Sequence, residues 1–103
     1  YDWLSPAILR FLRRVVLSCS GYKVDLGVCG EMGGRRLEAL ALLGLGIRRL
    51  SITPAGVGPI KELIRCVDTR EITEAMNGWL LNPPQNMRAE LQAWAQAREI
   101  EVE

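Results

Sequence analysis

The sequence has 103 residues, enough for one domain of modest size, and 49% of them are hydrophobic and 24% charged. Thirteen basic residues are balanced by twelve acidic ones, for a net charge of +1, and the two signs are mixed along the chain. This balance argues against a nucleic-acid surface, and the lack of a long apolar stretch argues against a membrane span.

The first predicted elements are a helix over residues 5–21, a strand over 23–29 and a helix over 36–45. A serine suits the N-cap of the first helix, and Pro6 suits its first turn, where a missing N–H does no harm. The strand is predicted because apolar residues alternate with polar or small ones. The helix over 36–45 is predicted to end at Gly46, which can adopt the left-handed conformation of a C-cap.

The second half of the chain is predicted to contain a short strand and three helices. The strand covers residues 49–53, and the Pro- and Gly-rich residues 54–59 are predicted to form a turn. Helices follow over 60–67, over 68–80, where the first residues resemble a capping box, and over 87–98.

The strand faces indicate a fold class. Strands that are joined through helices run parallel, with right-handed crossovers. Each predicted strand has one aliphatic side and one small or polar side, whereas both faces of a doubly wound sheet are covered by helices and tend to be apolar. The pattern favours strands that line a barrel near a site, and an open doubly wound sheet is the alternative.

Cys29 is the main candidate for chemistry. It is predicted at the C-terminal end of the first strand, on its small or polar side, and Gly30, Gly33 and Gly34 would let a ligand approach the backbone. A cysteine is more often a small buried hydrophobe, and that interpretation stays open here. The chain has no histidine, which excludes Cys–His pairing within it. A thiol without a nearby cation stays protonated at neutral pH, so it serves better as a proton donor than as a nucleophile.

Other features of this region point to chemistry less specifically. The glycine spacing at Gly27, Gly30 and Gly33 suggests a phosphate-binding loop, but it matches neither the dinucleotide-binding nor the P-loop pattern. Glu31 is either catalytic or a carboxylate that interacts with the dipole of the following helix.

The cysteines also indicate the cellular setting. Cys19, Cys29 and Cys66 are far apart and form no Cys-x-x-Cys pair, so neither a disulfide framework nor a zinc site is predicted, and a reducing cytoplasm is the simplest location. Cys19 and Cys66 are predicted to be structural. The start of the sequence lacks both an initiator Met and the basic-then-apolar layout of a signal peptide, so we expect the chain to begin within a longer protein.

A resemblance to a known family is carried by the stretch DLGVCGEMGGRRLEALALLGLGIRRLSITPAGVGPIKELIR. It resembles the last two β/α units of the phosphoenolpyruvate-utilising barrel of enzyme I, the phosphoenolpyruvate–protein phosphotransferase. YDWLSPAILRFL resembles the preceding segment, with Ser5 in place of the family's usual histidine. The resemblance covers residues 1–67, and residues 68–103 are predicted to be C-terminal helices of the same barrel domain. The Glu-Met after Cys-Gly favours the nitrogen-related branch.

The predicted fold class is therefore α/β: the terminal β/α units of a (β/α)8 TIM barrel, with two parallel strands and flanking helices, as a fragment of a larger domain. The resemblance implies that the full-length protein transfers the phosphoryl group of phosphoenolpyruvate to a protein histidine and releases pyruvate, in sugar transport or nitrogen regulation. It implies that Cys29 protonates the enolate carbon and that Gly30 and Glu31 are neighbours that shape the substrate site.

The resemblance also implies a cofactor and partners. Mg²⁺ is expected in the full-length enzyme, with ligands from earlier strands that are not in this chain, so the isolated chain is expected to be inactive. The expected partners are phosphoenolpyruvate, a histidine-containing phosphocarrier protein and a second copy in a homodimer, with no nucleic acid and no membrane.

Three other interpretations remain. The chain could be a non-catalytic α/β fragment for interaction or assembly, since two strands alone leave their edges exposed. It could be a relative of pyruvate phosphate dikinase or phosphoenolpyruvate synthase, although these tend to carry Gln in place of Glu31. A nucleotide-binding module rests on the glycine spacing alone.

Overall fold

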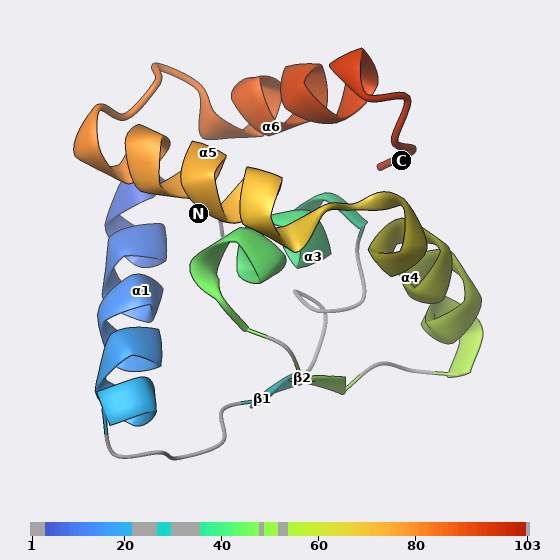
Figure 1. Cartoon of the computed structure of the whole chain (residues 1–103), viewed down its shortest axis with the longest axis horizontal. Helices are drawn as coiled ribbons and strands as arrows, with labels where there is room; N and C mark the ends of the chain where they lie inside the picture. Colours follow the sequence, from blue (N-terminus) through green and yellow to red (C-terminus); the bar gives the residue numbers. More distant parts are fainter. Residues whose placement is uncertain (1–3, 22–26, 30–35, 48, 52–53, 103) are drawn as a thin grey trace.

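The computed structural model describes residues 4–21, 27–29, 36–47, 49–51 and 54–102, with side chains for 4–18, 36–47 and 57–102. Its elements, in chain order, are α1 (Pro6–Gly21), β1 (Gly27–Cys29), α3 (Arg36–Leu45), β2 (Arg49–Ser51), α4 (Pro54–Cys66), α5 (Thr69–Leu81) and α6 (Met87–Ala97). Figure 1 shows α3 in the middle of the molecule, with α1 and α4 on opposite sides and α5 and α6 above it.

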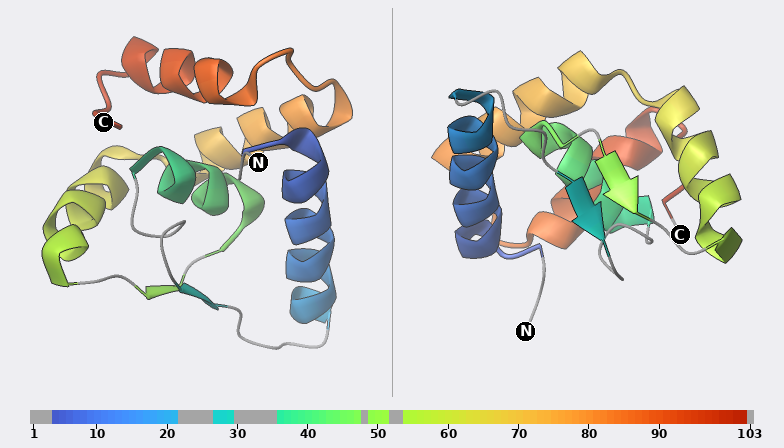
Figure 2. Two further views of the ribbon diagram at one scale, coloured as in Figure 1. Left: turned by 180° about the vertical axis from the view of Figure 1, so that it is seen from behind. Right: turned by 90° about the horizontal axis from the view of Figure 1, so that it is seen from below.

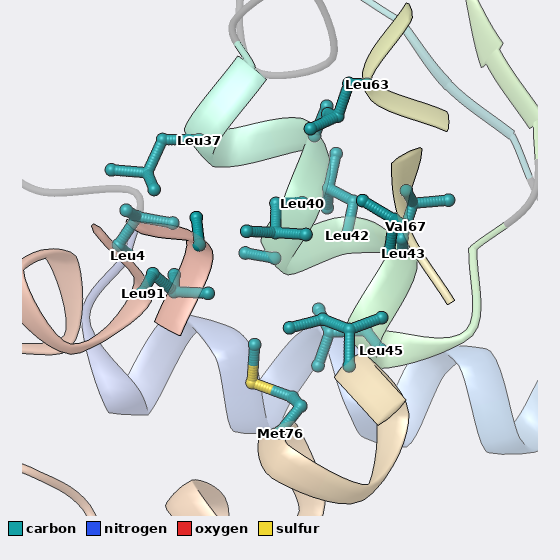
Figure 3. Close-up of a cluster of buried hydrophobic side chains, with 14 of the residues drawn as sticks. Leu4, Leu37, Leu40, Leu42, Leu43, Leu45, Leu63, Val67, Met76 and Leu91 are labelled. Carbon is teal, nitrogen blue, oxygen red and sulfur yellow. The ribbon is translucent and has the colours of Figure 1, made fainter. Parts of the chain in front are cut away.

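α3 is the centre of the core. Every residue from Leu37 to Leu45 is buried, and α3 contacts α1, α4, α5 and α6. A helix that is apolar on all sides has to be covered on all sides, which explains this central position. Figure 3 shows the leucines of α3 among side chains from other elements, including Leu4, Met76 and Leu91. The structure thus buries the entire helix beyond its first residue.

The predicted C-terminal stop of α3 is confirmed. Gly46 has a φ of 102°, in the left-handed region that favours glycine. The Gly46 amide donates to the Leu43 carbonyl at 3.0 Å, and the Ile47 amide donates to the Leu42 carbonyl at 3.1 Å. These two bonds form a Schellman motif, which satisfies carbonyl groups that the helix end leaves free.

Two arginines attach α1 to its neighbours through backbone carbonyls. Arg13 donates from Nη1 to the Leu45 carbonyl at 3.2 Å and so binds the C-terminal end of α3. Arg10 donates from Nε and Nη2 to the Leu80 carbonyl of α5, at 3.2 and 3.1 Å. A guanidinium group near a helix C-terminus also interacts favourably with the helix dipole. Arg10 and Arg13 therefore connect α1 to α5 and to α3.

β1 and β2 pair in parallel, with Val28 opposite Leu50 and Cys29 opposite Ser51. The predicted parallel direction is therefore confirmed. Figures 1 and 2 show the two strands at the end of the molecule away from α6. Each strand has three residues, and the remaining parts of the predicted strands, residues 23–26 and 52–53, lie outside the described residues.

The predicted fold class is wrong. The part of the chain that the structure describes is essentially helical, with four helices packed around α3, and it does not form the terminal β/α units of a TIM barrel. Its buried side chains come from the helices and from residues that flank them. Two strands of three residues offer too little surface to organise a layer of helices, whereas the apolar surface of α3 is large enough to do so.

The predicted turn over residues 54–59 is also wrong. α4 begins at Pro54, and Pro59 lies inside the helix. Proline is harmless in the first turn, but an interior proline removes one backbone hydrogen bond. Ile60 and Leu63 follow it and are buried in the core, so tertiary packing compensates for the unfavourable residue.

α5 and α6 follow the predictions to within one residue at each end. The Asp68 carboxylate accepts from the Arg70 amide at 2.9 Å, which makes Asp68 the N-cap of α5. The Asn86 side chain accepts from the Ala89 amide at 3.0 Å and caps α6 in the same way. Both caps satisfy amides that a helix start leaves free, and they fix where each helix begins.

Candidate functional site

Cys29 is the last residue of β1, as predicted, and pairs with Ser51 at the end of β2. Since the strands are parallel, their carboxyl ends lie next to each other at one edge. The other two predicted site residues, Gly30 and Glu31, lie outside the described residues, as does the side chain of Cys29. The structure thus places the backbone of Cys29 at a strand end, and the next described residue along the chain is Arg36, where α3 begins.

The first turn of α3, which begins seven residues after Cys29, carries a buried charge. Glu38 is 1% exposed and accepts from Nη1 of Arg88 at 2.9 Å. Burial of a carboxylate is costly unless it is paired and hydrogen-bonded, and Arg88 of α6 supplies that pairing. A carboxylate in the first turn also interacts favourably with the helix dipole.

A second ion pair holds the same turn. Nη1 of Arg36 lies 3.1 Å from Oε1 of Glu101, which follows α6. The arginine side chain is largely covered, whereas the Glu101 side chain is 80% exposed. The start of α3 is therefore contacted by charged groups from two places in the C-terminal third of the chain.

A hollow of about 170 Å³ lies beside this ion pair, between α4 and the residues after α6. It is lined by Arg36, Pro59, Glu62, Leu63, Cys66, Glu99, Ile100 and Glu101. The Cys66 thiol is exposed and lies 4.0 Å from Oε1 of Glu62, to which it donates. Cys66, which the sequence predicts to be structural, therefore lies on the surface of α4 rather than in the core. The lining mixes one cation with three carboxylates and favours neither an anion nor a neutral ligand.

The described residues do not supply a metal site. Among them no group of three or more His, Cys, Asp or Glu side chains is arranged to hold a metal ion. They do not by themselves supply ligands for Mg²⁺, and the expectation of Mg²⁺ bound by ligands from outside this chain stays a prediction. In the same part of the chain, no helix is both long and apolar enough to cross a membrane.

The tryptophan side chains that the structure describes serve packing. Trp94 is 9% exposed, and the Arg98 guanidinium lies 4.0 Å from the centroid of its ring. Such a cation–π contact covers the ring from solvent. Trp79 is partly buried against the core, and Trp3 lies outside the described residues.

Sequence reasoning missed the two ion pairs at the start of α3. Glu38 and Arg88 are 50 residues apart, and no local pattern pairs them. One signal was present: Glu38 is the one acidic residue in the apolar run from Leu37 to Leu45. An acid in a helix that is buried on all sides requires a cationic partner.

The comparisons with known proteins identify the family. The sequence model of the family described as "PEP-utilising enzyme, PEP-binding domain" matches residues 1–69. A phosphoenolpyruvate-protein phosphotransferase of Borreliella burgdorferi is 38% identical over 77 residues, which cover 75% of this chain and 13% of that protein. A Salmonella typhimurium protein named phosphoenolpyruvate-dependent phosphotransferase system is 40% identical over 68 residues, 66% of this chain and 9% of that protein.

The chain is also similar to a more distant relative. Multiphosphoryl transfer protein 1 of Escherichia coli is 31% identical over 74 residues, 72% of this chain and 9% of that protein. The chain thus spans about a tenth of the length of the curated relatives it matches. The family match includes Cys29, Gly30 and Glu31 and ends at the first residue of α5. The resemblance predicted from residues 1–67 is confirmed, and the chain belongs to the family of PEP-utilising enzymes, in the part described as their PEP-binding domain.

Proposed function

We propose that this chain is part of a phosphotransferase that moves the phosphoryl group of phosphoenolpyruvate to a protein histidine, and that Cys29 donates a proton in that reaction. One observation carries the proposal: Cys29, Gly30 and Glu31 lie within the matched residues, and Cys29 ends a strand whose carboxyl end lies beside that of its parallel partner. The names of the relatives, which include phosphoenolpyruvate-protein phosphotransferase, support the reaction class.

The proposed reaction needs one proton donor, and a single thiol supplies it. The phosphorus–oxygen bond of phosphoenolpyruvate breaks as a nitrogen of the histidine bonds to phosphorus, which leaves the enolate of pyruvate. The Cys29 thiol then gives its proton to the methylene carbon of the enolate, and pyruvate leaves. The resulting thiolate takes a proton from solvent, which restores the starting state. A thiol with an ordinary pKa of about 8.5 is protonated at neutral pH and suits this role.

The remaining components of the reaction are part of the proposal. The 103 residues contain no histidine, so the accepting histidine belongs to another segment or another protein. Ligands for Mg²⁺, as expected from the family resemblance, would likewise come from outside the described residues. The isolated chain is therefore expected to be inactive. A histidine-containing phosphocarrier protein as partner, a homodimer, the nitrogen-related branch and a cytoplasmic location stay predictions.

Substitution of Cys29 in the full-length protein tests the proposal. We expect Cys29→Ala and Cys29→Ser to slow pyruvate formation by about 100-fold or more, the usual contribution of a general acid. Binding of phosphoenolpyruvate, measured at equilibrium by calorimetry, is expected to stay within about two-fold, because the thiol acts after the phosphoryl group has left.

Cys66→Ser is the matched control, since Cys66 is an exposed thiol that takes no part in the proposed step. This variant is expected to retain the turnover of the unmodified protein. Substantial turnover by Cys29→Ala would contradict the role of Cys29 as proton donor.

A further inference from the structure

The first turn of α3 is held by the C-terminal third of the chain, through Arg88 on Glu38 and Glu101 on Arg36. We propose that Arg88 and Glu101 are positioning residues: they hold the start of α3, the next described element after the Cys29 strand, and through it influence the reaction at Cys29. This inference rests on the proposed function of Cys29, and the two can be tested separately.

Arg88 has a fixed position from which to hold Glu38. It is the second residue of α6, whose start is set by the Asn86 cap, and the neighbouring Met87 and Leu91 are buried in the core. Its guanidinium therefore reaches Glu38 from a helix that is itself anchored. The Glu38 side chain is 2% exposed, so solvent screens this contact far less than a surface pair.

Glu101 is held opposite Arg36 by the turn that ends α6. The Ile100 amide donates to the Ala95 carbonyl at 2.9 Å, and the Ile100 side chain is buried. The preceding residue, Glu99, has a φ of 58°, which turns the chain back toward α3. An exposed ion pair is weak by itself, but here the backbone on the Glu101 side is already fixed.

The connection to the site follows from the chain order. β1 ends at Cys29 and α3 begins at Arg36, so Gly30 and Glu31 belong to a segment of six residues whose two ends are set by these elements. The pairing of Cys29 with Ser51 holds one end, and the two ion pairs hold the other. Displacement of a reacting group by about 1 Å can cost about 100-fold in rate, so we expect a shift of the α3 start that reaches Cys29 to slow the reaction.

The boundary of the family match, at residue 69, supports the same interpretation. Arg36 and Glu38 lie within the matched residues 1–69, whereas Arg88 and Glu101 lie beyond them. The C-terminal residues therefore act on the matched part at the turn that comes after the Cys29 segment.

The test compares Glu101→Gln with Glu99→Gln in the full-length protein. Both substitutions remove one exposed carboxylate that lines the same hollow, but Glu101 is the one that pairs with Arg36. We expect Glu101→Gln to lower kcat for pyruvate formation three- to ten-fold with KM for phosphoenolpyruvate within two-fold, and Glu99→Gln to leave both unchanged. Arg88→Gln is expected to have the larger effect, and Arg88→Lys to restore part of it.

A second readout does not depend on the proposed reaction. The rate at which iodoacetamide alkylates Cys29 is measured by mass spectrometry of the peptide that contains it, with the Cys19 peptide as internal reference. We expect Glu101→Gln and Arg88→Gln to change the Cys29 rate at least three-fold relative to Cys19, and Glu99→Gln to leave it unchanged. A merely stabilising role would alter both cysteines or neither.

The outcomes separate the two proposals. If Cys29→Ala keeps its turnover while Glu101→Gln changes the alkylation of Cys29, the proton-donor role fails and the positioning role stands. If Cys29→Ala is inactive while Glu101→Gln leaves both kcat and alkylation unchanged, the positioning role is overturned. Should Arg88→Gln fail to fold, Glu101→Gln decides alone, because Glu101 is an exposed side chain whose loss leaves the core intact.

Discussion

Gly44 of α3 lies so close to Met76 of α5 that a β-carbon at position 44 would stand 3.1 Å from the Met76 Cβ. The same atom would lie 3.2 Å from the Ile72 carbonyl oxygen, so the neighbour on that side is backbone and cannot move freely. Glycine at this position therefore sets how closely the two helices pack.

Gly44→Ala is expected to destabilise the chain despite the better helix propensity of alanine. Overpacking costs about 1–3 kcal/mol, which outweighs the gain of about 1 kcal/mol from propensity. Gly78→Ala, in α5, is the matched control: its β-carbon would meet nothing within 4 Å, and the free energy of unfolding is expected to rise by about 0.5–1 kcal/mol. Urea denaturation measures both, and equal shifts would contradict the close approach of α3 and α5.

The contact between Arg88 and Glu38 is expected to appear as a coupling energy. Arg88→Ala leaves a buried carboxylate without this partner and is expected to lower the free energy of unfolding by about 2–3 kcal/mol. In a double-mutant cycle with Glu38→Gln, the two losses are expected to be non-additive by about 1–2 kcal/mol. Arg70→Ala, which removes an exposed arginine of α5, is expected to stay within about 0.5 kcal/mol. Additive losses would show that the pair does not form.

Substitutions at the two helix ends that have a positive φ are expected to change the free energy of unfolding in opposite directions. Glu99 adopts a φ of 58° without the freedom of glycine, so Glu99→Gly is expected to raise the free energy of unfolding by about 0.5–1 kcal/mol. Gly46→Ala is expected to lower it by about 1–2 kcal/mol, because φ is 102° and the new β-carbon would lie 3.3 Å from Cγ1 of Val16. Thermal unfolding followed by circular dichroism distinguishes a rise from a fall.

Neighbouring residues of α1 test which side of that helix faces the core. Leu9 is fully buried, and Leu9→Ala is expected to cost about 2–5 kcal/mol in the free energy of unfolding. Phe11 is 64% exposed, and Phe11→Ala is expected to stay within about 0.5 kcal/mol. A large loss from Phe11→Ala in urea denaturation would mean that α1 is rotated relative to the described orientation.

The local parts of the fold could be predicted from the sequence. The bounds of α3 follow from an apolar run that ends at Gly46, and the start of α5 follows from Asp68. The start of α4 could not be predicted in the same way, because Pro54 and Pro59 are typical of turns and the burial of Ile60 that compensates for them is tertiary. The barrel was inferred from alternation along two short segments, and alternation does not report how many strands lie beside them.

The candidate site, too, could be predicted from the sequence only in part. The position of Cys29 at the end of a strand could be predicted, because alternation and the glycine next to it are local signals. The ion pairs that hold the start of α3 could not, since Arg36 and Glu101 are brought together by the turn at Glu99 and the burial of Ile100. A contact of that kind depends on the whole packing of the chain.

The central position of α3 has a consequence for how the chain unfolds. Because α1, α4, α5 and α6 all contact α3, no helix in the described part can separate without bringing apolar surface of α3 into contact with water. The amide hydrogens of α3 are therefore expected to exchange with deuterium through global unfolding alone. On that basis the matched residues 1–69 and the two C-terminal helices melt as one cooperative unit, although the family match includes neither α6 nor most of α5.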